Sequence, residues 1–215
     1  MPIAAESVLK ALKEMRERTK KRNFVQSVEL IVNLRDIDLR RPEERIQEFV
    51  ELPHPPNKEV KVCVFATGDL ALRAREAGVD VLGREELEAL AGNKAEQKRL
   101  ANKYDFFIAE ATLMPLVGKI LGPVLAPRGK MPTPIPPTAD ISREVERRRR
   151  MVQLRARKEP VVQCRVGTED MKDEELAENI QAVITRLEAR LKRGLKNIAS
   201  IYVKETMGPA VKVSM

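Results

Sequence analysis

The apolar residues of this chain follow two different patterns, one near the termini and another in the middle. Phe24–Leu34 alternates apolar and polar residues largely with a period of two, as expected for a strand with one buried face. Val60–Phe65 and Tyr104–Ala109 are instead apolar runs, which are typical of strands buried on both faces of a parallel sheet. Helical segments alternate with these runs. The chain is therefore predicted to be an α/β protein with two different sheets.

The terminal segments predict a two-layer α+β domain with an antiparallel sheet, which we call the outer domain. Helices are expected at about Ala4–Lys20 and Asp173–Arg193; the second has acidic residues in its first turn and basic ones at its end. Neither terminal piece can bury a core alone, so we expect them to fold together with both helices on one face. The expected strands are Phe24–Leu34, Arg45–Leu52, Val161–Val166, Ile198–Val203 and Ala210–Val213.

The middle segment predicts an inserted three-layer α/β/α domain, Rossmann-like, with a parallel sheet. Proline-containing crossings at Pro53–Asn57 and Lys158–Pro160 mark its ends. The expected domains are residues 1–59 plus 159–215 and residues 60–158, with a hinge between them. Leu121–Asp140, which is rich in proline and glycine, is expected to be a loop.

Positive charge is concentrated in one segment of the chain. The formal net charge is +8, and residues 119–158, with eleven basic and three acidic side chains, carry all of it. Such a field attracts polyanions, nucleic acid first and an anionic membrane surface second, because the arginine run has few bulky apolar partners. A solvated, ion-paired helix face is the alternative. The candidate basic contacts are Arg128, Lys130, Arg147, Arg148, Arg149 and Arg150.

The sequence offers little for catalysis, metals or cofactors. It has one histidine, His54, between prolines, and two distant cysteines, Cys63 and Cys164, which suggest a reduced cytoplasmic compartment. The turn at residues 66–69 follows a buried strand, where α/β folds bind ligands, but it lacks a glycine-rich phosphate motif. A small-molecule or enzymatic module there is the rival hypothesis. No stretch without charged residues exceeds nine residues and the first thirty are charged, so no membrane span or secretory signal is expected.

The segment at residues 121–134 carries the most specific motif. Arg128 and Lys130 flank Gly129 among prolines, which suits either a phosphate-binding loop or a packed connection with special dihedrals. The motif, LGPVLAPRGKMPTP, resembles the signature of the universal ribosomal protein L-one family, with Ala126 where bacterial members often have glycine. Residues 23–29 and 206–209 also match. The resemblance covers essentially the whole chain and is of the archaeal type.

This resemblance implies an RNA-binding protein without catalysis or cofactor. Family members bind large-subunit ribosomal RNA at the mobile stalk near the tRNA exit site, help deacylated tRNA to leave, and repress translation by binding their own messenger RNA. The implied partners are these three RNAs, with no membrane, for a cytoplasmic, ribosome-associated protein that is a monomer off the ribosome. Carried over by position, the RNA-binding residues are Phe24, Gln26, Ser27, Glu29, Gly167, Thr206, Met207 and Gly208.

The implied site raises two questions of geometry and charge. Strand alternation puts Phe24 and Gln26 on the face opposite Ser27 and Glu29, so either some of these residues only support the site or the strand ends or bulges locally. The amide of Gly208 is a candidate phosphate donor, and polar side chains near it can bond 2′-hydroxyls. The basic segment lies outside the outer domain; it either adds long-range attraction or faces a second RNA, such as the departing tRNA. A shape-blind nucleic-acid binder is the third hypothesis.

Overall fold

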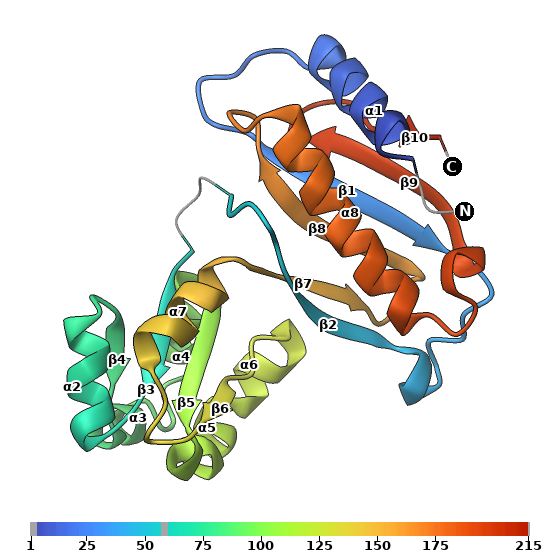
Figure 1. Ribbon diagram of the computed structural model, residues 1–215. Coiled ribbons are helices and arrows are strands. Elements are labelled where there is room, and N and C mark those ends of the chain that lie inside the picture. Colours follow the sequence, from blue (N-terminus) through green and yellow to red (C-terminus); the bar gives the residue numbers. More distant parts are fainter. Residues whose placement is uncertain (1–3, 57–59, 215) are drawn as a thin grey trace. The chain divides into compact units, whose positions relative to one another are not determined.

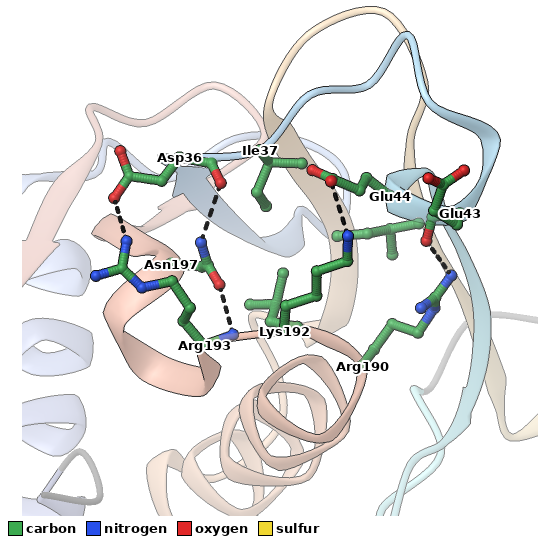
Figure 2. Close-up of a pocket in the computed structure, with 10 residues that line it drawn as sticks. Asp36, Ile37, Glu43, Glu44, Arg190, Lys192, Arg193 and Asn197 are labelled. Carbon is green, nitrogen blue, oxygen red and sulfur yellow. Dashed lines mark hydrogen bonds and ion pairs between the residues drawn. The ribbon is translucent and has the colours of Figure 1, made fainter.

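The computed structural model describes residues 4–56 and 60–214, which fold into two compact units (Figure 1). The outer unit comprises Met1–Lys58 and Arg150–Met215, and the inserted unit comprises Glu59–Arg149. The expected α/β class, with one antiparallel and one parallel sheet, is confirmed. Among the described residues, no helix is long and apolar enough to cross a membrane.

The outer unit has two helices on one face of a four-stranded antiparallel sheet (Figure 1). Alternate residues of β1 are buried, so one face of this strand contributes Val28, Leu30, Val32 and Leu34 to the core shared with the helices. The strand order is β10-β9-β1-β8. The elements are α1 (Ala5–Arg18), β1 (Ser27–Leu34), β8 (Val161–Thr168), α8 (Asp173–Arg190), β9 (Ile198–Glu205) and β10 (Val211–Val213), with short 3-10 turns at Pro42–Glu44 and Gly194–Asn197.

A two-stranded antiparallel ribbon completes the outer unit. It pairs β2 (Ile46–Glu51) with β7 (Met151–Ala156), and both strands send apolar side chains into the outer core. The boundary of the outer unit therefore falls before Arg150, not at the expected residue 159, because β7 finds its partner in β2. Counted on the sequence, the outer unit then has a net charge of +6 and the inserted unit +2, which together make the +8 of the chain.

The inserted unit is a parallel sheet between two layers of helices. Along β3, Val62 and Val64 pack in one apolar cluster with α2 and α7, and Cys63 and Phe65 pack in another with α3, α4, α5 and α6. The strand order is β4-β3-β5-β6. The elements are β3 (Val62–Phe65), α2 (Gly68–Glu76), β4 (Asp80–Leu82), α3 (Arg84–Ala89), α4 (Lys94–Lys103), β5 (Phe106–Glu110), a 3-10 turn (Ala111–Leu113), α5 (Met114–Ile120), α6 (Gly122–Arg128), β6 (Thr133–Ile135) and α7 (Ile141–Arg149).

The loop expected at residues 121–140 is wrong in part, since it contains α6 and β6. Pro123 lies in the first turn of α6, where a missing N–H costs no hydrogen bond. Gly129 ends this helix in a left-handed conformation (φ 73°) that glycine adopts without strain. Pro134 lies in β6, an edge strand that tolerates a residue without an N–H. Pro123 and Gly129 therefore mark the two ends of α6.

Candidate nucleic-acid interface

The start of β1 answers the question that strand alternation raised. The strand begins at Ser27, three residues later than predicted, so Phe24 and Val25 precede it and are 53% and 59% exposed. Gln26 keeps the alternation, because it is buried in step with the inward residues of β1 and its carbonyl accepts a hydrogen bond at 2.9 Å from the amide of Glu169, the residue opposite it. The alternation ends at Phe24, which is exposed, so neighbouring side chains at residues 24 and 25 both reach solvent.

Gln26 lies fully buried between three segments of the chain. Its Nε2 donates to Oε2 of Glu205 at 3.1 Å and to Oε2 of Glu169 at 3.2 Å. Its Oε1 accepts from the amide of Met207 at 3.1 Å. With 0% exposure and these partners, the Gln26 side chain is placed to support the surface above it.

The turn at residues 206–208 is held against the start of β1. The amide of Thr206 donates to the carbonyl of Ser27 at 3.0 Å, and the Thr206 hydroxyl lies 3.1 Å from the Ser27 amide and 3.2 Å from its carbonyl. The amide of Gly208 donates to the carbonyl of Glu205 at 2.9 Å. The amides of all three turn residues are therefore engaged within the protein. The Gly208 amide, expected as a free phosphate donor, is among them.

Close packing favours glycine at both glycine positions of the implied site. A Cβ at Gly208 would lie 2.4 Å from Oγ1 of Thr19, at the end of α1, and the short Thr19 side chain would have to move as a whole. A Cβ at Gly167 would lie 2.3 Å from Cδ2 of Leu176 and 2.8 Å from Sδ of Met171, so the ends of these two side chains would have to shift. Each glycine therefore lets two segments approach closely, which is a structural reason for glycine that needs no RNA contact.

What remains accessible is a small patch that we call the turn patch: Phe24, Val25, Ser27, Glu29 and Met207. Its apolar members are Phe24, Val25 and Met207, the last 58% exposed; among the described residues outside the patch, only Leu72, in the inserted unit, is a comparably exposed large apolar side chain. Ser27 and Glu29 are half-buried on the sheet face opposite the helices. No hydrogen bond or ion pair joins the Glu29 carboxylate to another described residue. The patch therefore combines apolar side chains with oxygen acceptors.

Comparison with known sequences identifies the family. Residues 12–209 match the model of the Ribosomal protein L1p/L10e family, which spans the turn patch and the motif near Gly129. The chain belongs to this family. It is 52% identical over 213 residues to the large ribosomal subunit protein uL1 of Hyperthermus butylicus, covering 99% of this chain and 98% of that protein. The uL1 proteins of Methanothermococcus thermolithotrophicus and Pyrococcus abyssi are each 50% identical, covering 97% and 99% of this chain and 98% of each relative. These organisms are archaea, as the resemblance implied.

The family's basic motif is turned inward in this structure. Nζ of Lys130 donates to the carbonyls of Ala101 and Tyr104, at 3.0 and 2.6 Å, at the C-terminal end of α4. Arg128 donates to the side chain of Asn102 on the same helix. Burial of Lys130 lowers the pKa of its ammonium. Of the two interpretations left open by the sequence, the geometry favours the packed connection.

The arginine run on α7 divides between core and surface. Arg148 is buried because it follows Ile141 and Val145 on the inward stripe of the helix, at spacings of four and three residues. This burial lowers the pKa of its guanidinium. Arg147, Arg149 and Arg150 are exposed, so three of the four arginines can face solvent or a partner.

The rival site at residues 66–69 is occupied by a carboxylate of the protein itself. β3 and β5 are neighbours at the point where the strand order reverses, which is where open α/β sheets bind ligands. Here Glu110 accepts hydrogen bonds from the Thr67 amide and hydroxyl, at 3.0 and 2.9 Å, and from the Thr112 hydroxyl at 2.6 Å. These bonds, that from Thr112 above all, lower the pKa of Glu110. A buried negative charge there opposes an anionic ligand.

Thiol and metal chemistry find no support in the described residues. Burial raises the pKa of the Cys63 and Cys164 thiols to about 12, so neither is a ready nucleophile. The described residues contain no cluster of three or more His, Cys, Asp or Glu side chains placed to hold a metal ion. Membership of a ribosomal protein family agrees with the expectation that the chain is not an enzyme.

Sequence reasoning missed the two carboxylates that bond to Gln26, of which Glu205 is buried and Glu169 is half-buried. Glu205 is only 4% exposed and lies on the inward face of β9, in step with Ile201 and Val203. A charged residue at an inward strand position is a readable sign of a buried polar network. Glu169 has no such sign, because it lies in the loop between β8 and α8.

Proposed function

We propose that this protein is a component of the large ribosomal subunit that binds ribosomal RNA at the mobile stalk near the tRNA exit site. Its relatives are named as large-subunit proteins, and the turn patch supports the RNA contact. The observation that carries the proposal is the pair of exposed side chains Phe24 and Met207, on two segments that the hydrogen bond from the Met207 amide to Gln26 holds together. Aromatic and apolar side chains in such positions stack on unpaired bases and riboses.

The chemistry of the turn patch favours ribose and base groups over phosphates. The amides of Thr206, Met207 and Gly208 all donate within the protein. The accessible polar groups include the Glu29 carboxylate and the Ser27 hydroxyl, which can accept hydrogen bonds from 2′-hydroxyls and base amino groups. A carboxylate does not bind a phosphate directly. Phosphate attraction then comes from the lysines and arginines of the outer unit.

The turn patch is also proposed to bind the protein's own messenger RNA and so to regulate its translation. A messenger RNA that presents the same folded structure would occupy the turn patch, so the protein represses its own translation when ribosomal RNA is saturated. Arg147, Arg149 and Arg150 are proposed to face the departing exit-site tRNA or to add long-range attraction. Off the ribosome the protein is proposed to be a cytoplasmic monomer.

A filter-binding titration tests the proposal. The protein is titrated against a stalk-type ribosomal RNA fragment, a scrambled RNA duplex and the DNA version of the fragment, at several salt concentrations. We expect the stalk fragment to bind about 10³-fold or more tightly than the scrambled duplex and to stay bound at raised salt. The DNA version should bind weakly because it lacks 2′-hydroxyls. Equal affinities that collapse together with salt would instead identify a shape-blind basic protein.

A further inference from the structure

A buried side-chain network lies directly beneath the turn patch. It joins Gln26, before β1, to Glu169, in the loop after β8, and to Glu205, at the end of β9. One amide nitrogen donates to one oxygen of each carboxylate, at 3.2 and 3.1 Å. An amide –NH₂ has two hydrogens, so a single glutamine satisfies both acids.

The two carboxylates determine which way the Gln26 amide points. In the observed orientation Nε2 faces both acids and Oε1 accepts from the Met207 amide at 3.1 Å. The flipped amide would place its oxygen against two carboxylates and its –NH₂ against the Met207 N–H, losing these three hydrogen bonds and the longer one from Nε2 to the Lys20 carbonyl at 3.5 Å. Carboxylates accept and amide N–H groups donate, so only one orientation satisfies every group.

Charged groups from other elements surround this network. Burial and the charge of Glu169 raise the pKa of Glu205, and Arg16 opposes that shift. Arg16, on α1, donates to the carbonyls of Glu169 and Met171 and to Oδ1 of Asp173, each at 2.6 Å. The loop that carries Glu169 is therefore fixed from two sides, by α1 and by Gln26.

We infer that Gln26, Glu169 and Glu205 are positioning residues, which hold the Met207 amide and thereby present the Met207 side chain for RNA before RNA arrives. The inference rests on the proposed function, because it assumes that the turn patch contacts RNA. It changes the role implied for Gln26 from an RNA contact to a buried support. A turn that is already ordered binds with less loss of conformational entropy, so the network strengthens binding without touching RNA.

The first test removes the amide and compares a matched glutamine. Gln26→Met keeps the length of the side chain but makes none of the hydrogen bonds of the Gln26 amide. Gln97→Met is the control, since Gln97 is also buried and its Nε2 donates to the Leu90 carbonyl at 2.9 Å, but in the inserted unit. With folding verified by circular dichroism, we expect at least a tenfold loss of affinity for the stalk fragment in the first variant and no change in the second. A folded Gln26→Met variant with wild-type affinity would overturn the inference.

The second test exchanges the groups of the network. Gln26→Glu brings a third carboxylate to the two acids and should weaken RNA binding more than Gln26→Met does. Adding Glu205→Gln restores one of the two amide–carboxylate bonds, because Gln at 205 can donate to Glu at 26, whose other oxygen accepts from Met207, while the contact between residues 26 and 169 still joins two carboxylates. We therefore expect the double variant to recover part of the affinity that Gln26→Glu loses. A double variant no tighter than Gln26→Glu would contradict the network.

Hydrogen exchange of the wild-type protein keeps the inference testable whatever the variants do. If Gln26 holds the turn in advance, the Met207 amide is protected from exchange in the free protein. Rapid exchange of this amide, with a protected β1, would show that the turn is not held. Loss of specific RNA binding by the wild type would refute the proposed function instead, so the two failures are distinguishable.

Discussion

The turn at residues 206–208 and the basic motif at residues 128–130 reverse what their compositions suggest. The basic motif has two cations around a glycine, which is the usual composition of a phosphate site. The turn is nearly neutral. In the structure Lys130 and Arg128 point at the end of α4, and the turn instead exposes Met207 beside Phe24.

The difference teaches that hydrogen-bond partners decide which residues can reach another molecule. In both regions the polar groups form hydrogen bonds within the protein. Carbonyls at the end of α4 accept from the ammonium of Lys130, and the side-chain oxygen of Gln26 accepts from the amide of Met207. Of the two regions, only the turn and the segment beside it expose large side chains, and these, Phe24 and Met207, are apolar. A cation already bonded to two carbonyls has little to offer a phosphate.

The largest effect is expected from removing both apolar side chains of the turn patch. Phe24→Ala combined with Met207→Ala should weaken binding to the stalk fragment about 100-fold, since stacking of an aromatic ring on a base is worth about 1–3 kcal/mol and the Met207 side chain adds an apolar contact. Stability should change little because both side chains are more than half exposed. Leu72→Ala, an equally exposed apolar side chain in the inserted unit, is the control for filter-binding titrations and urea unfolding. Weak binding by the control, or tight binding by the double variant, would refute the comparison.

The reverse behaviour is expected of Lys130. Lys130→Met leaves the carbonyls of Ala101 and Tyr104 without their donor, which should destabilise the inserted unit by about 1–3 kcal/mol. Lys119→Met, at an exposed position of α5, removes the same charge and serves as the control in urea unfolding. RNA affinity should be the same in both variants. A loss of affinity confined to Lys130→Met would return the motif to the RNA-binding surface.

The sequence predicted the two sheets well because their burial patterns differ along the chain. Alternation in β1 and the continuous run in β3 reflect one buried face and two. The start of β1 could not be read in the same way, because the buried Gln26 finds its partners in Glu169 and Glu205, which are distant in sequence. Burial of Arg148 was readable from its spacing to Val145, but the arginine run concealed it.

Glu205 and Glu110 extend the comparison of the two units, because acid should change the contribution of each carboxylate to stability in opposite directions. Each is a buried carboxylate at the end of a strand, Glu205 beneath the turn patch and Glu110 beside Thr67. Hydrogen bonds from Thr112 and Thr67 lower the pKa of Glu110, whereas burial and Glu169 raise that of Glu205. The charged form is therefore favoured by folding in the inserted unit and disfavoured in the outer unit.

The smallest expected effect is the pH dependence that follows from these shifts. Because the pKa of Glu110 is lowered by folding, its stabilisation is present above the unfolded pKa and is lost as pH falls through the folded pKa. Glu110→Gln should therefore destabilise the inserted unit near pH 7, and destabilise it less in acid. Because the pKa of Glu205 is raised by folding, its charged form costs stability above the folded pKa. Glu205→Gln should therefore stabilise the outer unit near pH 7, and this gain in stability should decrease as pH falls towards the unfolded pKa. Hydrogen exchange, read residue by residue from about pH 4 to pH 8, follows the two units separately. Changes of the same sign in both units would contradict the comparison, because hydrogen bonds from Thr112 and Thr67 outweigh burial at Glu110, whereas burial and repulsion by Glu169 prevail at Glu205.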